Sequence, residues 1–261
     1  MKTTGLLWKF YKSDPNDCHY LFGTMHLATD AAYTYVELAK EYIQKSSLYA
    51  AEMDLNDVKN EDMMVYFKLS PDAKFSDFFR PKQYIKYRLL ILKSLNIDLD
   101  HYLNFTPFFI NNLLAEVSLK RTKNEALDHH LWQYAMNHEL EMVGVESFEN
   151  QLNILKQIPL AFQIKSFKDT VRNISSFRKK INNLNELYRK GDLVQLYKSS
   201  RKSMGSIRKM MIYDRNVFMT ERIIELSNRK SSFFSIGAAH FAGNKGIIAM
   251  LKKNGYILKN I

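Results

Sequence analysis

Two histidines of this chain each follow an apolar segment through the same short pattern, Gly-x-x-His. The first is Gly23-Thr24-Met25-His26, and the second, 214 positions further on, is Gly237-Ala238-Ala239-His240. Glycine lets the backbone turn where a side chain would clash, so each pattern places an imidazole just beyond the end of a strand. If the two strands are neighbours, the two imidazoles lie side by side, as in a catalytic or metal site.

Two acidic residues stand at comparable positions. Glu52 follows the apolar run 48–51, and Glu146 follows the apolar run 141–145. A carboxylate next to a buried strand costs free energy unless it is paired or coordinates an ion. In the structural alternative, Glu52 is only a helix cap or a salt-bridge partner.

Arg215 lies in a long helix expected over 213–228. At a catalytic site its guanidinium would stabilise developing negative charge. In the structural alternative it is a surface arginine bridged to Asp214 or Glu221.

His26, Glu52 and His240 together are the minimal protein ligand set of a catalytic divalent cation, which lowers the pKa of a bound water and polarises a carbonyl. Manganese, cobalt, zinc and iron all suit these ligand types. Without a metal, the same groups form an acid–base site in which a histidine, oriented by Glu52 or Glu146, takes a proton from the attacking water. Both interpretations predict a hydrolase.

The segments that carry these residues predict an α/β fold. At the N-terminal end we expect a hairpin of two strands over 6–11 and 18–22, a helix over 34–45 and a strand over 48–51. The C-terminal end returns to a strand over 233–236, a helix over 247–253 and a closing strand over 256–258. Between them, helical spacing dominates, over 82–95, 107–120, 126–137, 160–173, 181–188 and from Asp192 onward. We therefore expect a single domain over 1–261, with a central mixed sheet formed by the two ends of the chain. A mostly helical insertion over 56–232 would cover the site.

Composition narrows the class of protein. The 261 residues, 46% hydrophobic and 25% charged, are typical of a globular chain. The net charge of +11 is compatible with anionic partners, but no zinc-finger, RNA-binding or basic-zipper pattern is present, so no nucleic acid is expected. Cys18 is the only cysteine, which excludes an intrachain disulfide and a cysteine-held zinc ion.

The chain as it stands predicts a cytoplasmic protein. Its first residues lack the apolar core of a signal peptide, and no stretch approaches the ~20 apolar residues that span a bilayer. A protein whose signal peptide had been removed would look the same and would be exported. The sequence indicates no oligomeric state.

Several phrases, in this order and spacing, resemble the TraB/GumN family, which includes the Tiki proteases and is related to erythromycin-esterase-like and ChaN-like proteins. They are the two Gly-x-x-His patterns, Ala51-Glu52-Met53-Asp54, Ala126-Leu127-Asp128, Val143-Gly144-Val145-Glu146-Ser147 with Glu149-Asn150-Gln151-Leu152, Gly191-Asp192, Arg215-Asn216 and Gly255-Tyr256. The resemblance runs from about Leu6 to Ile257.

This resemblance implies metal-dependent peptide hydrolysis, with manganese or cobalt as the ion and a peptide or amide as substrate. It also implies that His26, Glu52 and His240 form the core of the site, with Arg215 and Glu146 as the family arginine and second glutamate. A metal-free esterase-like hydrolase is the alternative among enzymes. Outside enzymes, the alternative is a protein that only binds a peptide or a haem.

Overall fold

The computed structural model describes residues 5–57 and 64–261, so 58–63, near the start of the expected insertion, lie outside the described residues. The chain forms two compact units. Unit 1 comprises Met1–Asp57, Arg121–Ile154 and Leu184–Ile261, and unit 2 comprises Val58–Lys120 and Leu155–Asn183. The expectation of a single domain with an insertion over 56–232 stays a prediction.

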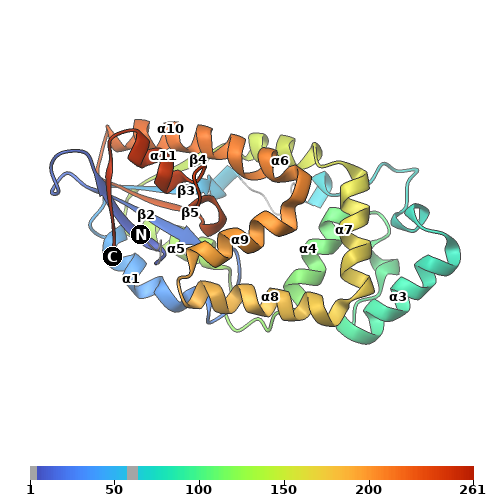
Figure 1. Cartoon of the computed structure of the whole chain (residues 1–261). Coiled ribbons are helices and arrows are strands. Elements are labelled where there is room, and N and C mark those ends of the chain that lie inside the picture. The colour runs from blue at the N-terminus through green and yellow to red at the C-terminus, as the bar shows by residue number, and fades with distance from the viewer. Residues whose placement is uncertain (1–4, 58–63) are drawn as a thin grey trace. The chain divides into compact units, whose positions relative to one another are not determined.

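Unit 1 is built on a six-stranded mixed sheet in the order β4-β3-β5-β2-β1-β6, four strands of which, β2 to β5, are labelled in Figure 1. The strands are β1 (Leu7–Tyr11), β2 (His19–Thr24), β3 (Leu48–Met53), β4 (Glu141–Glu146), β5 (Ser232–Gly237) and β6 (Ile257–Asn260). Strands β4, β3, β5 and β2 are parallel, whereas β1 pairs antiparallel with both β2 and β6. The predicted α/β fold is confirmed, and β4 is the strand that the middle of the chain contributes.

Strands β2 and β5 are direct neighbours, with Thr24 opposite Gly237 in the register. Carboxyl ends of parallel strands meet at one edge of a sheet, where ligands bind in such folds. Both Gly-x-x-His patterns therefore start from adjacent positions at this edge, so the condition that their strands are neighbours is met.

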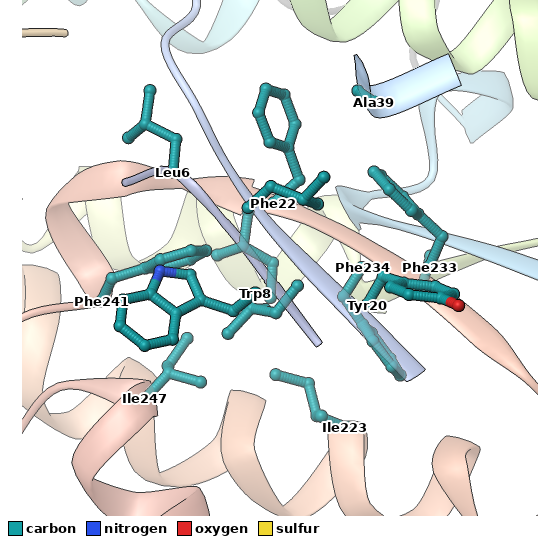
Figure 2. Packing of buried hydrophobic residues seen from close by; sticks show 14 of the residues in the cluster. Leu6, Trp8, Tyr20, Phe22, Ala39, Ile223, Phe233, Phe234, Phe241 and Ile247 are labelled. Carbon is teal, nitrogen blue, oxygen red and sulfur yellow. The ribbon is translucent and has the colours of Figure 1, made fainter. Parts of the chain in front are cut away.

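Helices cover both faces of the sheet. Helices α1 (Val36–Ile43) and α5 (Leu127–Asn137) lie on one face, and α10 (Arg215–Ser227) and α11 (Ile247–Lys253) lie on the other (Figures 1 and 2). Successive side chains of a strand point to opposite faces. Phe233 therefore stacks on Tyr49 on the first face, with ring centroids 5.8 Å apart, and Phe234 contacts Phe10 on the second, with ring centroids 5.9 Å apart. The sheet is thus buried on both sides.

The remaining helices of the described chain are α3 (Pro81–Leu95), α4 (Pro107–Val117), α6 (Phe148–Lys156), α7 (Leu160–Arg172), α8 (Ile174–Arg189) and α9 (Leu193–Met204). Short 3₁₀ turns occupy Ala32–Tyr35, Leu55–Asp57, Phe75–Phe78, Leu99–Tyr102, Gly205–Ile207 and Ala238–His240, and one π-helical turn occupies Lys209–Asp214.

Capping residues explain where two of these helices start. Before α4, the Thr106 side chain accepts a hydrogen bond from the backbone N–H of Phe109, and before α9, the Asp192 side chain accepts one from the backbone N–H of Gln195.

Helices α8 and α6 depart most from the sequence prediction. Helix α8 begins at Ile174 rather than at 181, because Ile174 and Phe177 extend its apolar spacing into the core of unit 2. Helix α6 was not predicted, and it starts where the Ser147 hydroxyl accepts a hydrogen bond from the Asn150 backbone N–H.

Unit 2 has its own aromatic core. Phe75 and Phe167 are fully buried and meet edge to face, with ring centroids 4.9 Å apart. Tyr87 and Ile91 of α3 pack into the same cluster. This core holds α3 through one face only, since Ile85 and Leu89 on its other face are exposed.

Candidate functional site

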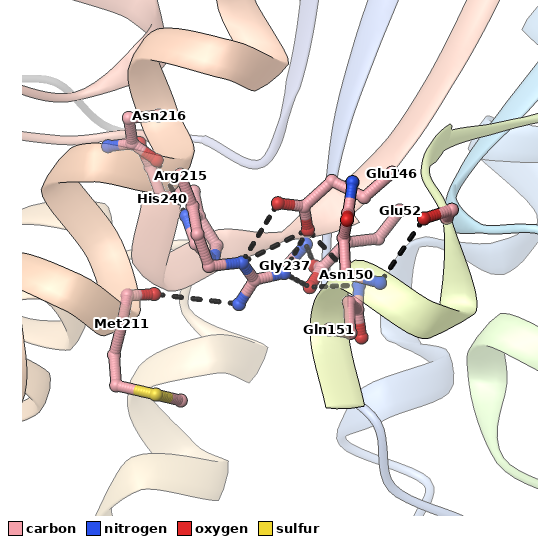
Figure 3. A network of polar contacts seen from close by, with 10 residues as sticks. Glu52, Glu146, Asn150, Gln151, Met211, Arg215, Asn216, Gly237 and His240 are labelled. Carbon is pink, nitrogen blue, oxygen red and sulfur yellow. Dashed lines mark hydrogen bonds and ion pairs between the residues drawn. The ribbon is translucent and has the colours of Figure 1, made fainter. Parts of the chain in front are cut away.

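A buried ion network lies at the carboxyl edge of the parallel strands, as Figure 3 shows. Arg215, the first residue of α10, places Nη2 2.5 Å from Oε1 of Glu52 on β3 and 2.5 Å from Oε2 of Glu146 on β4. Its Nε lies 3.1 and 3.0 Å from the two oxygens of Glu146. One guanidinium therefore joins the two predicted glutamates, and the surface pairing of Arg215 with Asp214 or Glu221 does not form.

Two further groups complete the network. Gln151 of α6 directs Nε2 toward Oε2 of Glu146 at 3.2 Å and Oε1 of Glu52 at 3.4 Å. The Gly237 backbone N–H donates to Oε2 of Glu52 at 2.9 Å. A Cβ on Gly237 would lie 3.1 Å from that oxygen, a tight contact, and 3.6 Å from the His240 ring, an ordinary one, so the absence of a side chain eases the approach of Glu52 to the end of β5.

Burial makes these charges interact strongly. The side chains of Glu146 and Arg215 are only 3% and 10% exposed. Burial alone would raise the pKa of Glu52, but the Arg215 guanidinium and the Gly237 N–H lower it to about 2. Burial and the neighbouring Glu52 charge outweigh Arg215 at Glu146 and raise the pKa of that carboxyl. The Arg215 guanidinium is thus shared by the carboxyl groups of Glu52 and Glu146.

Asn216 fixes the tautomer of His240. Its amide nitrogen donates to the backbone carbonyls of Lys245 and His240 at 2.7 and 3.2 Å, so its Oδ1 faces Nδ1 of His240, 2.6 Å away, as an acceptor. The proton of a neutral imidazole then sits on Nδ1, and Nε2 carries a lone pair. Burial lowers the pKa of His240 to about 4, which keeps the ring neutral at pH 7.

His26 has a different environment. Its side chain is 72% exposed, and Nδ1 lies 3.2 Å from Oδ2 of Asp128 on α5. The ring of His129 lies 6.1 Å from that of His26. A histidine held by a carboxylate is oriented for proton transfer or for metal binding through its other nitrogen.

The structure therefore brings Glu52, Glu146 and Arg215 into direct contact, with His240 beside Glu52 across Gly237. Among residues 5–57 and 64–261, no three His, Cys, Asp or Glu side chains stand together in a way that could hold a metal ion. His26 consequently does not share one ligand group with Glu52 and His240 in this arrangement.

Sequence reasoning gave no role to three residues that touch the site: Gln151, Asn216 and Asp128. Each stands in a phrase that resembles the family, next to or near a residue that was singled out. Their contacts depend on side-chain direction in the folded chain, for which the sequence holds no signal beyond these phrases.

Comparison with known proteins adds to this geometry. The sequence profile of the TraB/PrgY/gumN family matches residues 6–260. The chain belongs to this family. Its curated relatives include metalloprotease TIKI1 of Xenopus tropicalis, 24% identical over 96% of this chain, and the metalloprotease TIKI homolog of Nematostella vectensis, 23% identical over 96%.

This TraB/PrgY/gumN family member spans 60% of the length of the Xenopus relative and 65% of the Nematostella relative. No solved structure matches the chain. In the described part of the chain, none of the helices has the length and apolar character needed to cross a membrane.

The donor types of Glu52 and His240 suit the divalent ion that the names of these relatives imply, although no group of three such side chains stands together in the described part of the chain. Glu52 offers carboxylate oxygens, and His240 offers a neutral imidazole whose Nδ1 is already held by Asn216. Two carboxylates share one guanidinium, so their full ionisation leaves a negative charge that a cation would neutralise.

Proposed function

We propose that this protein is a metal-dependent hydrolase that cleaves a peptide or a related amide bond. One observation carries the proposal: a buried Glu52–Arg215–Glu146 network adjoins the neutral His240 at the carboxyl edge of the sheet. Membership of the TraB/PrgY/gumN family and similarity to named metalloproteases support it. Manganese or cobalt is the proposed ion, with zinc or iron as alternatives of suitable ligand chemistry.

In this proposal Glu52 and His240 would hold the ion, and the exposed ring of His26 would turn toward them to complete the ligand set. The ion would supply an activated water and polarise the scissile carbonyl. Glu146 fixes the plane of the Arg215 guanidinium through Nε and Nη2, and Arg215 in turn holds Oε1 of Glu52. Arg215 and Glu146 therefore orient the carboxylate and tune its charge. Asn216 and Asp128 orient the two imidazoles.

The metal content of protein purified without chelator tests the proposal. We expect a stoichiometric ion in the native protein and its loss in His26→Ala, His240→Ala and Glu52→Gln. Titration of the apoprotein with Mn²⁺ and Co²⁺ should restore cleavage of a pool of quenched-fluorescent peptides. Metal-free native protein with full activity would refute the metal-dependent mechanism.

A metal-free hydrolase is the second candidate, and a specific observation favours it. Both oxygens of Glu52 already accept hydrogen bonds, from Arg215 and from Gly237. The contact of His26 with Asp128 is also that of a general base with its orienting carboxylate. In that case activity survives exhaustive chelation but is lost in His26→Ala.

The same variant separates both enzymes from a protein that only binds a peptide or a haem. For an enzyme, His26→Ala abolishes turnover. For a binding protein, no turnover is seen with native protein, and the variant changes ligand affinity alone.

A further inference from the structure

The positive charge of this chain is concentrated in unit 2. The sequence of unit 2, Val58–Lys120 with Leu155–Asn183, contains 16 lysines and arginines and 8 aspartates and glutamates. It thus supplies +8 of the net charge of +11. The hydrolase site, which lies in unit 1, does not account for this charge.

Four of these cationic side chains line one cavity. A hollow of about 720 Å³ is lined by Arg80, Lys82 and Lys86 at the start of α3 and by Arg172 at the end of α7. Tyr87 and Leu90 supply apolar surface to it. None of its lining residues is acidic, so the cavity suits an anionic group.

A second hollow, of about 490 Å³, continues the cationic surface along α7. Arg172 lines both hollows, and Lys165 and Lys168 line the second. Its one acidic residue, Asp169, lies 3.8 Å from Arg172 and offsets part of the charge. Asp98 and Asp100, which follow α3 in the chain, form ion pairs with Arg88, which lines neither hollow.

The outer face of α3 adds exposed apolar side chains to this charge. Ile85, Leu89 and Leu92 are 54%, 55% and 37% exposed, and their i, i+4, i+7 spacing places them in one stripe along the helix. Lys82, Lys86 and Lys93 fall beside that stripe, while Tyr87, Ile91 and Leu95 bury the opposite face. An exposed apolar stripe next to lysines is typical of a helix that lies in a membrane interface.

We propose that the outer face of α3, with the adjoining cationic cavity, docks this protein on an anionic lipid surface. Ile85, Leu89 and Leu92 insert among the acyl chains near the headgroups, and Lys82, Lys86 and Arg172 bind lipid phosphates. A nucleic acid or an acidic peptide would need the cations but would leave the apolar stripe in water. The stripe therefore favours lipid.

Vesicle flotation tests this proposal with the whole 261-residue chain. Vesicles of phosphatidylcholine mixed with phosphatidylglycerol should bind the protein, and vesicles of phosphatidylcholine alone should bind it far more weakly. Lys82→Gln/Lys86→Gln should weaken binding on the order of thirtyfold, since each lysine near an anionic surface contributes roughly fivefold. Ile85→Gln/Leu89→Gln should weaken it by at least about tenfold through lost apolar burial.

Lys252→Gln/Lys253→Gln is the matched control, because it removes two exposed lysines from α11 in unit 1. This control should bind as the native chain does, and circular dichroism should show that all three variants fold. Equal loss of binding in the control would mean that net charge alone acts, and would overturn the proposal. So would native-like binding by Ile85→Gln/Leu89→Gln, complete displacement by inorganic phosphate, or no binding to the mixed vesicles.

Discussion

Replacing Arg215 by methionine is the sharpest test of the buried network. Methionine keeps an unbranched apolar stem but leaves Glu52 and Glu146, whose side chains are 27% and 3% exposed, without their shared cation. Removing one partner of a buried ion pair costs about 3–5 kcal/mol. For a chain of this size, that corresponds to a fall in Tm of roughly 6–20 °C.

The pH dependence of this loss has a definite sign. Without Arg215, burial and mutual repulsion hold the carboxylate pKa values above the ordinary value of 4.5. The folded variant then binds more protons than its unfolded chain between about pH 4.5 and the raised pKa, so its stability falls as pH rises through that window. The destabilisation should therefore be larger at about pH 7.5 than at about pH 5.

Thermal unfolding followed by circular dichroism at both pH values measures the effect. Arg222→Met is the matched control, because Arg222 lies on the same helix in a partly exposed i, i+3 pair with Glu225, and its loss should cost less than about 1 kcal/mol. Arg215→Met/Glu146→Gln should recover part of the loss by removing one buried charge. A cost for Arg215→Met no larger than that of the control, or one that does not change with pH, would refute this reasoning.

Three further predictions concern the imidazoles. Burial lowers the pKa of His240 to about 4 from 6.5, so the unfolded chain binds the proton before the native protein does. The free energy of unfolding of the native protein should therefore fall by roughly 3 kcal/mol between about pH 6.5 and about pH 4. Urea unfolding of His240→Gln should lack this loss. Asn216→Leu should abolish the preference for the Nδ1–H tautomer of His240, which Asn216→Asp should keep; ¹⁵N spectra of the ring that are identical in the two variants would contradict the assignment. Asp128→Asn should weaken Mn²⁺ binding by roughly tenfold to a hundredfold in calorimetric titration, with little change in Tm, whereas native affinity would show that Asp128 does not orient His26.

The elements of the sheet could be predicted from local sequence, because apolar runs and glycine turns act over a few residues. Strand β3 and the two Gly-x-x-His strands were expected from such runs, and their parallel order follows from the crossover segments between them. Helix α6 was not predicted, although the Ser147 cap at its start is itself a local signal.

The sequence by itself indicated the candidate site residues: Glu52, Glu146, His26 and His240 stand at strand ends, and Arg215 in a helix, because glycine turns, buried runs and helical spacing are local properties. Only the tertiary structure decided how they pair. Pairing depends on which strands become neighbours and on where side chains some hundred residues apart point, so Arg215 meets Glu52 and Glu146 while His26 turns toward Asp128.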